Sequence, residues 1–277
     1  MVGAMDVERM DGKLALVTGA GSGIGRETAL LCARRGANLA LCDVDEAGLQ
    51  ATEADAVRLG SEVLARLVDV ADRDQMQDFA AAVHERVAAV DLLVNNAGVG
   101  LGAGFLETEL TDWDWILPIN VMGVVHGCHM FVPPMVERGR GGHVVNLSSA
   151  AGFFANPSLT AYTTTKFAVL GLSESLRIEL RPLAIGVTAV CPGLINTPIT
   201  RNSRLRGSAA DQRERTVRIY ERRNYGPDRV ALRILDAVQH NRAVMPVTAE
   251  AWAMWWLARF TPSLARGVAR VIDAAAR

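Results

Sequence analysis

The segment "KLALVTGAGSGIGRETALLCARRGA", residues 13–37, decides the fold of this 277-residue chain. Its apolar run over 13–19 predicts a buried strand, and the pattern over 25–37 predicts a helix that ends at a glycine. Between them, a glycine-rich turn lets backbone N–H groups approach a pyrophosphate at the positive end of the helix. Strand, turn and helix in this order predict a dinucleotide-binding unit, whose candidate cofactor-binding residues are Gly19, Ser22, Gly23, Ile24 and Gly25.

The rest of the chain alternates short apolar runs with helical patterns. Further strands are expected at or within 38–43, 61–70, 91–98, 142–149, 185–193 and 242–247, and helices over 45–60, 72–90, 111–138 and 160–183. This alternation predicts a single-domain, doubly wound (Rossmann) α/β fold, with a parallel sheet of about seven strands and helices on both faces. We expect one domain over 1–277, with a disordered lead over 1–11 and a helical extension over 248–277.

Composition excludes several classes of function. The formal net charge is −1 and half of the residues are hydrophobic, so we expect no nucleic-acid partner. We find no secretory signal and no uncharged apolar stretch of about 18 residues, and therefore expect a cytoplasmic protein without a transmembrane segment. The four cysteines are scattered through apolar segments, which predicts buried free thiols, and no cluster of side chains predicts a metal site.

Asp43, at the end of the second expected strand and 18 residues after Gly25, predicts the choice of cofactor. A carboxylate there can hydrogen-bond both hydroxyls of an adenosine ribose, and it would repel a 2′-phosphate. The next residue is Val44 instead of an arginine, and Ser22 supplies no positive charge to the loop. These three residues favour NAD over NADP. The alternative is that Asp43 merely caps the helix that follows.

Tyr162 and Lys166, in the segment "AYTTTKFAVLGL" (161–172), lie one helical turn apart. An ammonium on the same helix face favours the phenolate and lowers the pKa of the tyrosine, which would let the pair exchange a proton with an alcohol or carbonyl. Taken alone, a Tyr/Lys pair at this spacing is common on solvated helices.

The sequence resembles the short-chain dehydrogenase/reductase family, strongly over about residues 11–200 and more loosely up to about 247. The motifs that carry the resemblance occur in the family's order along the chain. They are the glycine loop, Asp69-Val70, "NNAG" from Asn95 to Gly98, Asn120, Ser149 located 13 residues before the tyrosine, Tyr162 to Lys166, and the turn Pro192-Gly193 followed by Thr197.

The resemblance implies a role for each matching residue. Tyr162 would be the general acid/base, and Lys166 would lower its pKa and hold the nicotinamide ribose. Ser149 would hydrogen-bond the reacting oxygen, and Asn120 would hold a water that links Lys166 to a proton relay. Cofactor contacts would come from Asp69 and Val70 at the adenine, from Asn96, Gly98, Pro192, Gly193 and Ile195 along the site, and from Thr197 at the carboxamide.

The surroundings of the substrate leave alternatives open. Residues 99–105, 150–157 and the chain from Gly193 onward should line the pocket, and Phe153 with Phe154 indicates either an apolar substrate or a subunit contact. By resemblance, 197–225 is a substrate lid, whose arginines either attract an anionic substrate or face solvent.

The extension shows two apolar helix faces, one formed by Trp252, Trp255, Trp256 and Phe260 and the other by Leu264, Val268, Val271 and Ile272. These faces favour a pocket roof or a subunit contact. An interfacial membrane anchor, aided by Arg259, Arg266 and Arg270, is the alternative.

We therefore expect an oxidoreductase that transfers a hydride between NAD(H) and a secondary alcohol or ketone. An NADPH-dependent 3-oxoacyl thioester reductase is the alternative enzyme, and a non-catalytic nucleotide-binding sensor or scaffold is the alternative of another class. By resemblance, the chain should form a homotetramer or homodimer through the two long helices that precede and follow strand 142–149.

Overall fold

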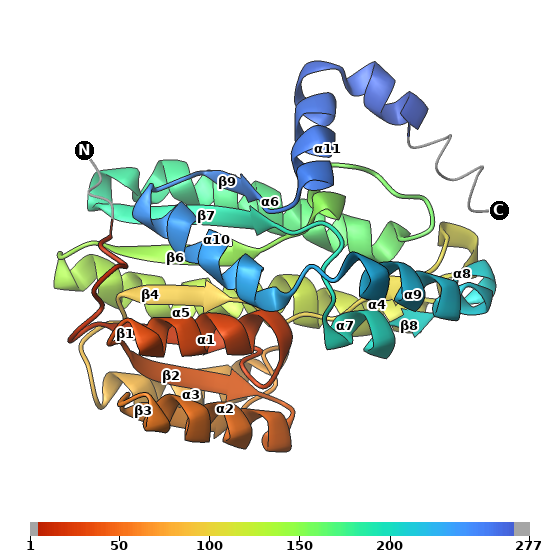
Figure 1. The fold of residues 1–277 in the computed structure, drawn as a ribbon. Coiled ribbons are helices and arrows are strands. Elements are labelled where there is room, and N and C mark those ends of the chain that lie inside the picture. The colour runs from red at the N-terminus through yellow and green to blue at the C-terminus, as the bar shows by residue number, and fades with distance from the viewer. Residues whose placement is uncertain (1–4, 269–277) are drawn as a thin grey trace.

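The computed structural model describes residues 5–268, which fold around a seven-stranded parallel sheet (Figure 1). Its strand order is β3-β2-β1-β4-β6-β7-β9. This is the doubly wound sheet that the sequence predicts. The strands are β1 (Leu14–Thr18), β2 (Asn38–Asp43), β3 (Val63–Leu67), β4 (Leu92–Asn95), β6 (Gly142–Leu147), β7 (Ile185–Cys191) and β9 (Val244–Pro246).

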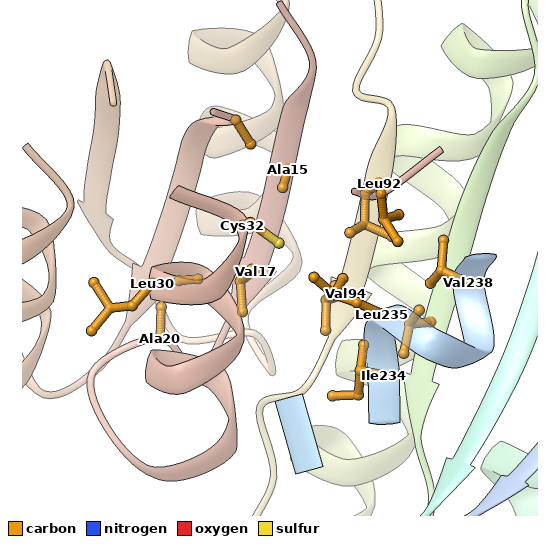
Figure 2. Packing of buried hydrophobic residues seen from close by; sticks show 14 of the residues in the cluster. Ala15, Val17, Ala20, Leu30, Cys32, Leu92, Val94, Ile234, Leu235 and Val238 are labelled. Atoms are coloured by element: carbon orange, nitrogen blue, oxygen red, sulfur yellow. The ribbon is translucent and has the colours of Figure 1, made fainter. Parts of the chain in front are cut away.

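Helices cover both faces of this sheet. One face carries α1 (Gly23–Arg34), α2 (Glu46–Arg58) and α10 (Pro227–Gln239), and the other carries α3 (Arg73–His84), α5 (Gly123–Arg138) and α6 (Thr160–Leu180). Successive strand residues point to opposite faces. Accordingly, Ala15 and Val17 pack in one cluster while Leu16 packs in the other. Figure 2 shows the first cluster, where Ile234, Leu235 and Val238 of α10 face the sheet beside Leu92 and Val94.

The lead before β1 differs from the prediction of a disordered segment over 1–11. Val7 and Met10 are fully buried in the cluster beneath α1 and α10. Their backbone is fixed as well, since Val7 N donates to Gln239 Oε1 at 2.9 Å and Met10 N donates to the Arg35 carbonyl at 2.7 Å. The segment lacks a long apolar run, which is why the sequence predicts disorder. Burial of Val7 and Met10 is nevertheless enough to hold it against the core.

The expected long helix over 111–138 is present but irregular. It consists of α4 (Leu110–Leu117), one π-helical turn η2 (Pro118–Met122) and α5, so that Gly123 N–H bonds the carbonyl of Pro118. Among residues 5–268 this helix, Leu110–Arg138, is the one long and apolar enough to cross a membrane. That evidence is weak, because buried core helices pass the same test and half of its most apolar stretch is buried here.

Two groups of short elements lie beyond the carboxyl ends of the strands. The lid region contains α7 (Pro198–Asn202), β8 (Arg204–Leu205), α8 (Gly207–Asp211) and α9 (Arg213–Arg223), and β8 pairs with β5 (Leu101–Gly102). Two 3-10 turns, η1 (Phe105–Glu107) and η3 (Ala150–Gly152), follow the carboxyl ends of β4 and β6, whereas η4 (Arg181–Leu183) precedes the amino end of β7. Helix α11 (Ala249–Phe260) rises from the sheet edge after β9, and residues 262–268 are also helical (Figure 1).

Candidate active site

One large cleft, of about 1570 Å³, opens at the carboxyl ends of the strands. Ligands of open α/β sheets bind at this edge. The cleft collects nearly every candidate residue of the sequence: Gly19, Ser22, Gly23, Ile24, Asp43, Asp69, Val70, Asn96, Gly98, Ser149, Tyr162, Lys166, Pro192, Gly193, Ile195 and Thr197. The two candidates that do not line it are Gly25, which lies beneath the loop, and Asn120, which is fully buried behind the tyrosine and lysine.

The glycine loop turns at two glycines and has no room for a side chain at Gly19 or Gly25. Gly19 and Gly23 adopt the left-handed backbone conformation, with φ of 65° and 54°. A Cβ at Gly25 would lie 2.0 Å from the Gly19 carbonyl oxygen. The side chain of Asn96 braces this turn by donating to the carbonyls of Thr18 at 2.9 Å and Gly19 at 3.0 Å. The loop therefore lies open to the cleft, with backbone N–H groups available at the start of α1.

Asp43 ends β2 at the rim of the cleft. Its Oδ2 accepts from Gly21 N at 2.7 Å and its Oδ1 accepts from Asp45 N at 2.9 Å, which fixes the carboxylate against the glycine loop. The N-cap of α2 is Asp45, whose side chain accepts from Gly48 N. Asp43 therefore does not cap that helix, and its carboxylate lies where it can meet a ribose.

The other end of the cleft holds Ser149, Tyr162 and Lys166. Ser149 follows β6 and accepts from Ala151 N at 3.2 Å, while Tyr162 and Lys166 project from α6. Lys166 is 5% exposed, donates to the Leu147 carbonyl at 3.0 Å and lies 5.6 Å from the centroid of the Tyr162 ring. The structure thus brings together the Tyr162–Lys166 pair and Ser149, which the family resemblance adds to it.

The pKa of Tyr162 differs from the expectation that Lys166 lowers it. Enclosure of the ring by surrounding protein raises this pKa, and a hydrogen bond with the Ser149 side chain opposes the rise. Burial also lowers the pKa of Lys166 to about 8, and its ammonium is already bound to the Leu147 carbonyl. Tyr162 is therefore held as a neutral phenol, a proton donor at neutral pH.

Asn120 lies in the π-helical turn, a local irregularity that is frequent at functional sites. Both ends of its side-chain amide are hydrogen-bonded: Oδ1 accepts from Val99 N at 2.8 Å, and Nδ2 donates to the Val99 carbonyl at 2.9 Å and to Thr165 Oγ1 at 3.2 Å. Asn120 thus fixes the segment after β4, at Val99, against α6.

The turn after β7 closes the cofactor side of the cleft. The carbonyl of Pro192 accepts from Ala150 N at 2.8 Å, which ties this turn to the Ser149 segment. Thr197, 8% exposed, packs against the glycine loop, since a Cβ at Gly23 would lie 3.5 Å from its Cβ. The loop, the two strand ends and this turn therefore form one continuous wall.

The substrate end of the cleft is largely apolar, and most of its lining comes from the ranges that the sequence predicts. Phe154 lines it, whereas Phe153 is buried against Trp255 with ring centroids 5.3 Å apart. Within the expected range from Gly193 onward, the lining residues are Leu205, Ala209, Gln212, Arg213, Ile219, Tyr220, Glu250 and Met254. Trp115 and Ile119 lie outside the expected ranges, and no motif or spacing marks them.

The lid arginines serve mostly to hold the lid in place. Arg206 forms a two-point ion pair with the fully buried Asp112, at 2.7 and 2.9 Å, and Arg204 stacks 3.7 Å over the Trp115 ring. Within the described chain Arg213 is the lid arginine that lines the cleft, where it donates to the carbonyls of Arg201 and Ser203.

Helix α11 forms part of the roof of the cleft through Glu250 and Met254. The expected shared face of its aromatic residues is divided: Trp252 and Trp255 pack inward, whereas Trp256 and Phe260 are 55% and 66% exposed. Leu264 is exposed as well. Arg270, Val271 and Ile272 lie outside the described residues.

Comparisons with known proteins show the family of this chain. Residues 13–207 match the family model described as short chain dehydrogenase, and the chain belongs to this family. It is 36% identical over 269 residues to the putative oxidoreductase SadH of Mycobacterium tuberculosis, covering 94% of this chain and 96% of SadH. A short-chain dehydrogenase/reductase from Burkholderia phymatum, solved in complex with NAD, matches with a TM-score of 0.85 and 33% identity, covering 91% of this chain and 94% of that one.

A longer relative matches at higher identity. The chain is 40% identical over 264 residues to the probable oxidoreductase EphD of Mycobacterium tuberculosis, an alignment that covers 93% of this chain and 45% of EphD. The chain therefore spans less than half the length of that relative.

Proposed function

We propose that this short-chain dehydrogenase transfers a hydride between NAD(H) and a secondary alcohol or ketone, with Tyr162 as the general acid/base. The observation that carries the proposal is a single cleft with Asp43 at one end and Ser149, Tyr162 and Lys166 at the other. The glycine loop lies between them, lines the cleft at the start of α1, and fits a pyrophosphate because backbone N–H groups converge there. A nicotinamide bound there supplies the chemistry of accepting or giving the hydride.

The proton step is assigned to Tyr162. In the reduction of a ketone, the Tyr162 hydroxyl gives its proton to the oxygen as the carbonyl carbon receives the hydride and its electron pair. In the oxidation of an alcohol, the phenolate takes the hydroxyl proton as the C–H bond gives up its hydride. Ser149 donates a hydrogen bond to the reacting oxygen, and Lys166 holds positive charge beside the ring.

NAD is the proposed cofactor because of Asp43. A 2′-phosphate on the adenosine ribose would meet its carboxylate, and like charges at contact distance repel. Val44, 65% exposed on the cleft rim, supplies no positive charge in compensation. The NAD bound to the Burkholderia phymatum relative supports the same choice.

An apolar substrate fits the far end of the cleft. Phe154, Trp115, Leu205, Ile219 and Met254 line it, and these side chains favour burial of a bulky apolar group. Gln212, Arg213 and Tyr220 are among the polar side chains that the lid adds to the cleft. A 3-oxoacyl thioester would need an anchor for its anionic carrier, and Arg213 already donates to two lid carbonyls.

The test is turnover of secondary alcohols and ketones with NAD(H) and NADP(H) in parallel, with small aliphatic, cyclic terpenoid, steroid and 3-hydroxyacyl classes represented. We expect turnover with NAD on an apolar class, and loss of about 10²–10⁴-fold in kcat in Tyr162→Phe with little change in the Kd for NADH. Turnover with NADP alone would overturn the reading of Asp43. Undiminished turnover in Tyr162→Phe would overturn the mechanism.

A further inference from the structure

Glu250 joins three segments that the cleft depends on. It lies in the first turn of α11, after the N-cap Thr248, and lines the cleft. Its Oε1 accepts from Leu194 N at 3.2 Å, and its Oε2 is bonded to the guanidinium of Arg223 at the end of lid helix α9. One carboxylate therefore contacts the turn after β7, the lid and the C-terminal extension together.

The turn after β7 is shaped around this carboxylate. A Cβ at Gly193 would lie 2.4 Å from Glu250 Oε1 and 2.3 Å from Thr248 Oγ1. Only a glycine there lets both side chains approach the backbone this closely. Since Pro192 also bonds the Ser149 segment, a shift of this turn would be felt at the reacting end of the cleft.

The ion pair lies in partly buried surroundings. The side chains of Glu250 and Arg223 are 25% and 32% exposed. Another ion pair of the lid, Arg206 with Asp112, holds an earlier part of the lid against α4. The Arg223–Glu250 pair holds its far end, so the segment that carries Ile219 and Tyr220 over the cleft is tied down at both ends.

We propose that Glu250 is a positioning residue whose two carboxylate oxygens hold the turn 192–194 and the lid helix α9 in one arrangement over the cleft. Oε1 positions the cofactor side of the cleft by holding the backbone at Leu194. Oε2 positions the substrate side by holding Arg223 of the lid. The inference rests on the proposed function for its kinetic consequences. Its structural consequence, lid opening controlled by Glu250, stands independently of any substrate.

Glu250→Gln separates the two contacts. The carboxamide keeps an acceptor for Leu194 N–H but loses the charge that pairs with Arg223. We expect amide exchange over 213–223, and tryptic cleavage at the lid arginines, to rise about tenfold as the lid end is released. The Kd for NADH should stay within about twofold, and KM for the substrate should rise while kcat does not fall. Lid exchange equal to that of the wild-type protein would overturn the proposal.

Glu250→Ala removes both contacts. We expect the same gain in lid exchange and, in addition, NADH binding weakened by about tenfold, measured by fluorescence titration. The matched control is Glu221→Gln, which removes the exposed lid ion pair with Arg201 and should leave both readouts unchanged. Equal effects in Glu221→Gln would overturn the proposal, because they would mean that any lost lid charge opens the lid. Exchange and tryptic cleavage need no turnover, so a failure of the proposed function is distinguishable from a failure of this inference.

Discussion

At the scale of single residues, the site depends on the pKa of Tyr162, which burial raises and the hydrogen bond with Ser149 lowers. Burial also lowers the pKa of Lys166 to about 8. Spacing indicated Tyr162 and Lys166, and the resemblance to the family added Ser149. The sequence could not predict the balance of burial and charge, since that depends on walls contributed by β6, β7 and the lid.

The pH dependence of alcohol oxidation tests this balance. Oxidation needs the phenolate, and a raised pKa leaves little of it at neutral pH, so log kcat should rise by about one for each pH unit below the apparent pKa. Ser149→Ala removes the hydrogen bond that favours the phenolate, and it should move the rising part of the pH profile to higher pH. We would measure kcat from pH 6 to 10 with both proteins. A flat profile would contradict the assignment of the proton step to Tyr162.

Gly25→Ala tests the cofactor loop. The added methyl would lie 2.0 Å from the Gly19 carbonyl oxygen, so the backbone of the loop must shift. We expect the Kd for NADH to rise by more than about tenfold, because the backbone N–H groups would no longer converge on the pyrophosphate. The control is Gly267→Ala, where the methyl meets nothing within 4 Å and NADH binding should be unchanged.

At the scale of elements, all seven main strands were predictable, because each is an apolar run between glycines or polar turns. The boundaries were less predictable: the expected strands at 61–70 and 91–98 contain only β3 and β4, of five and four residues. The two-residue strands β5 and β8 were missed, since their pairing depends on the lid docking through Arg204 and Arg206. The sequence left a pocket roof, a subunit contact and a membrane anchor open for the C-terminal extension. Only the packing of α11 shows that it contributes to the roof of the cleft.

His143 makes the pairing of β6 and β7 sensitive to acid. It is 2% exposed, its Nε2 is hydrogen-bonded to Thr188 Oγ1 at 2.8 Å, and burial, with a smaller effect of Arg177, lowers its pKa from 6.5 to about 3. Between those values the unfolded chain binds a proton that the folded chain excludes. Stability is therefore complete above pH 6.5 and is lost as the pH falls, by up to about 1.4 kcal/mol per pH unit.

Replacement by a neutral amide tests this expectation. In His143→Gln the free energy of unfolding should fall less steeply between pH 6.5 and 4 than in the wild-type protein, as measured by urea denaturation at several pH values. Other groups titrate in the same range, but they are common to both proteins. Parallel curves would contradict the claim that the buried imidazole excludes its proton.

At the scale of the whole molecule, the cleft is assembled from the full length of the chain. The N-terminal strands provide the glycine loop and Asp43, the middle provides Ser149, Tyr162 and Lys166, and the C-terminal third provides the lid and α11. This division separates a cofactor half built on strand ends from a substrate half built on helices. This explains why motifs predicted single residues of the cofactor half, whereas the substrate half was predicted only as ranges of the chain.

The outer surfaces of the long helices lead to the last prediction, a homotetramer or homodimer. Helix α6 exposes Phe167 and Ile178, at 43% and 77%, on either side of Gly171, whose Cβ position meets no atom within 4 Å. An exposed apolar helix face of this kind fits a second copy of the same helix. Light scattering should therefore give two or four times the 29.7 kDa of one chain.

The double substitution Phe167→Asp with Ile178→Asp should reduce that mass, because it places carboxylates opposite their own copies across a symmetric contact. The control is Val57→Asp on α2, where a residue of similar exposure, 55%, lies far along the sheet from α6 and should leave the mass unchanged (Figure 1). A wild-type mass of 29.7 kDa at working concentration would refute the oligomer. If the multimer persists in the double variant, its interface lies on another surface, such as the one formed by the exposed Trp256 and Phe260 of α11.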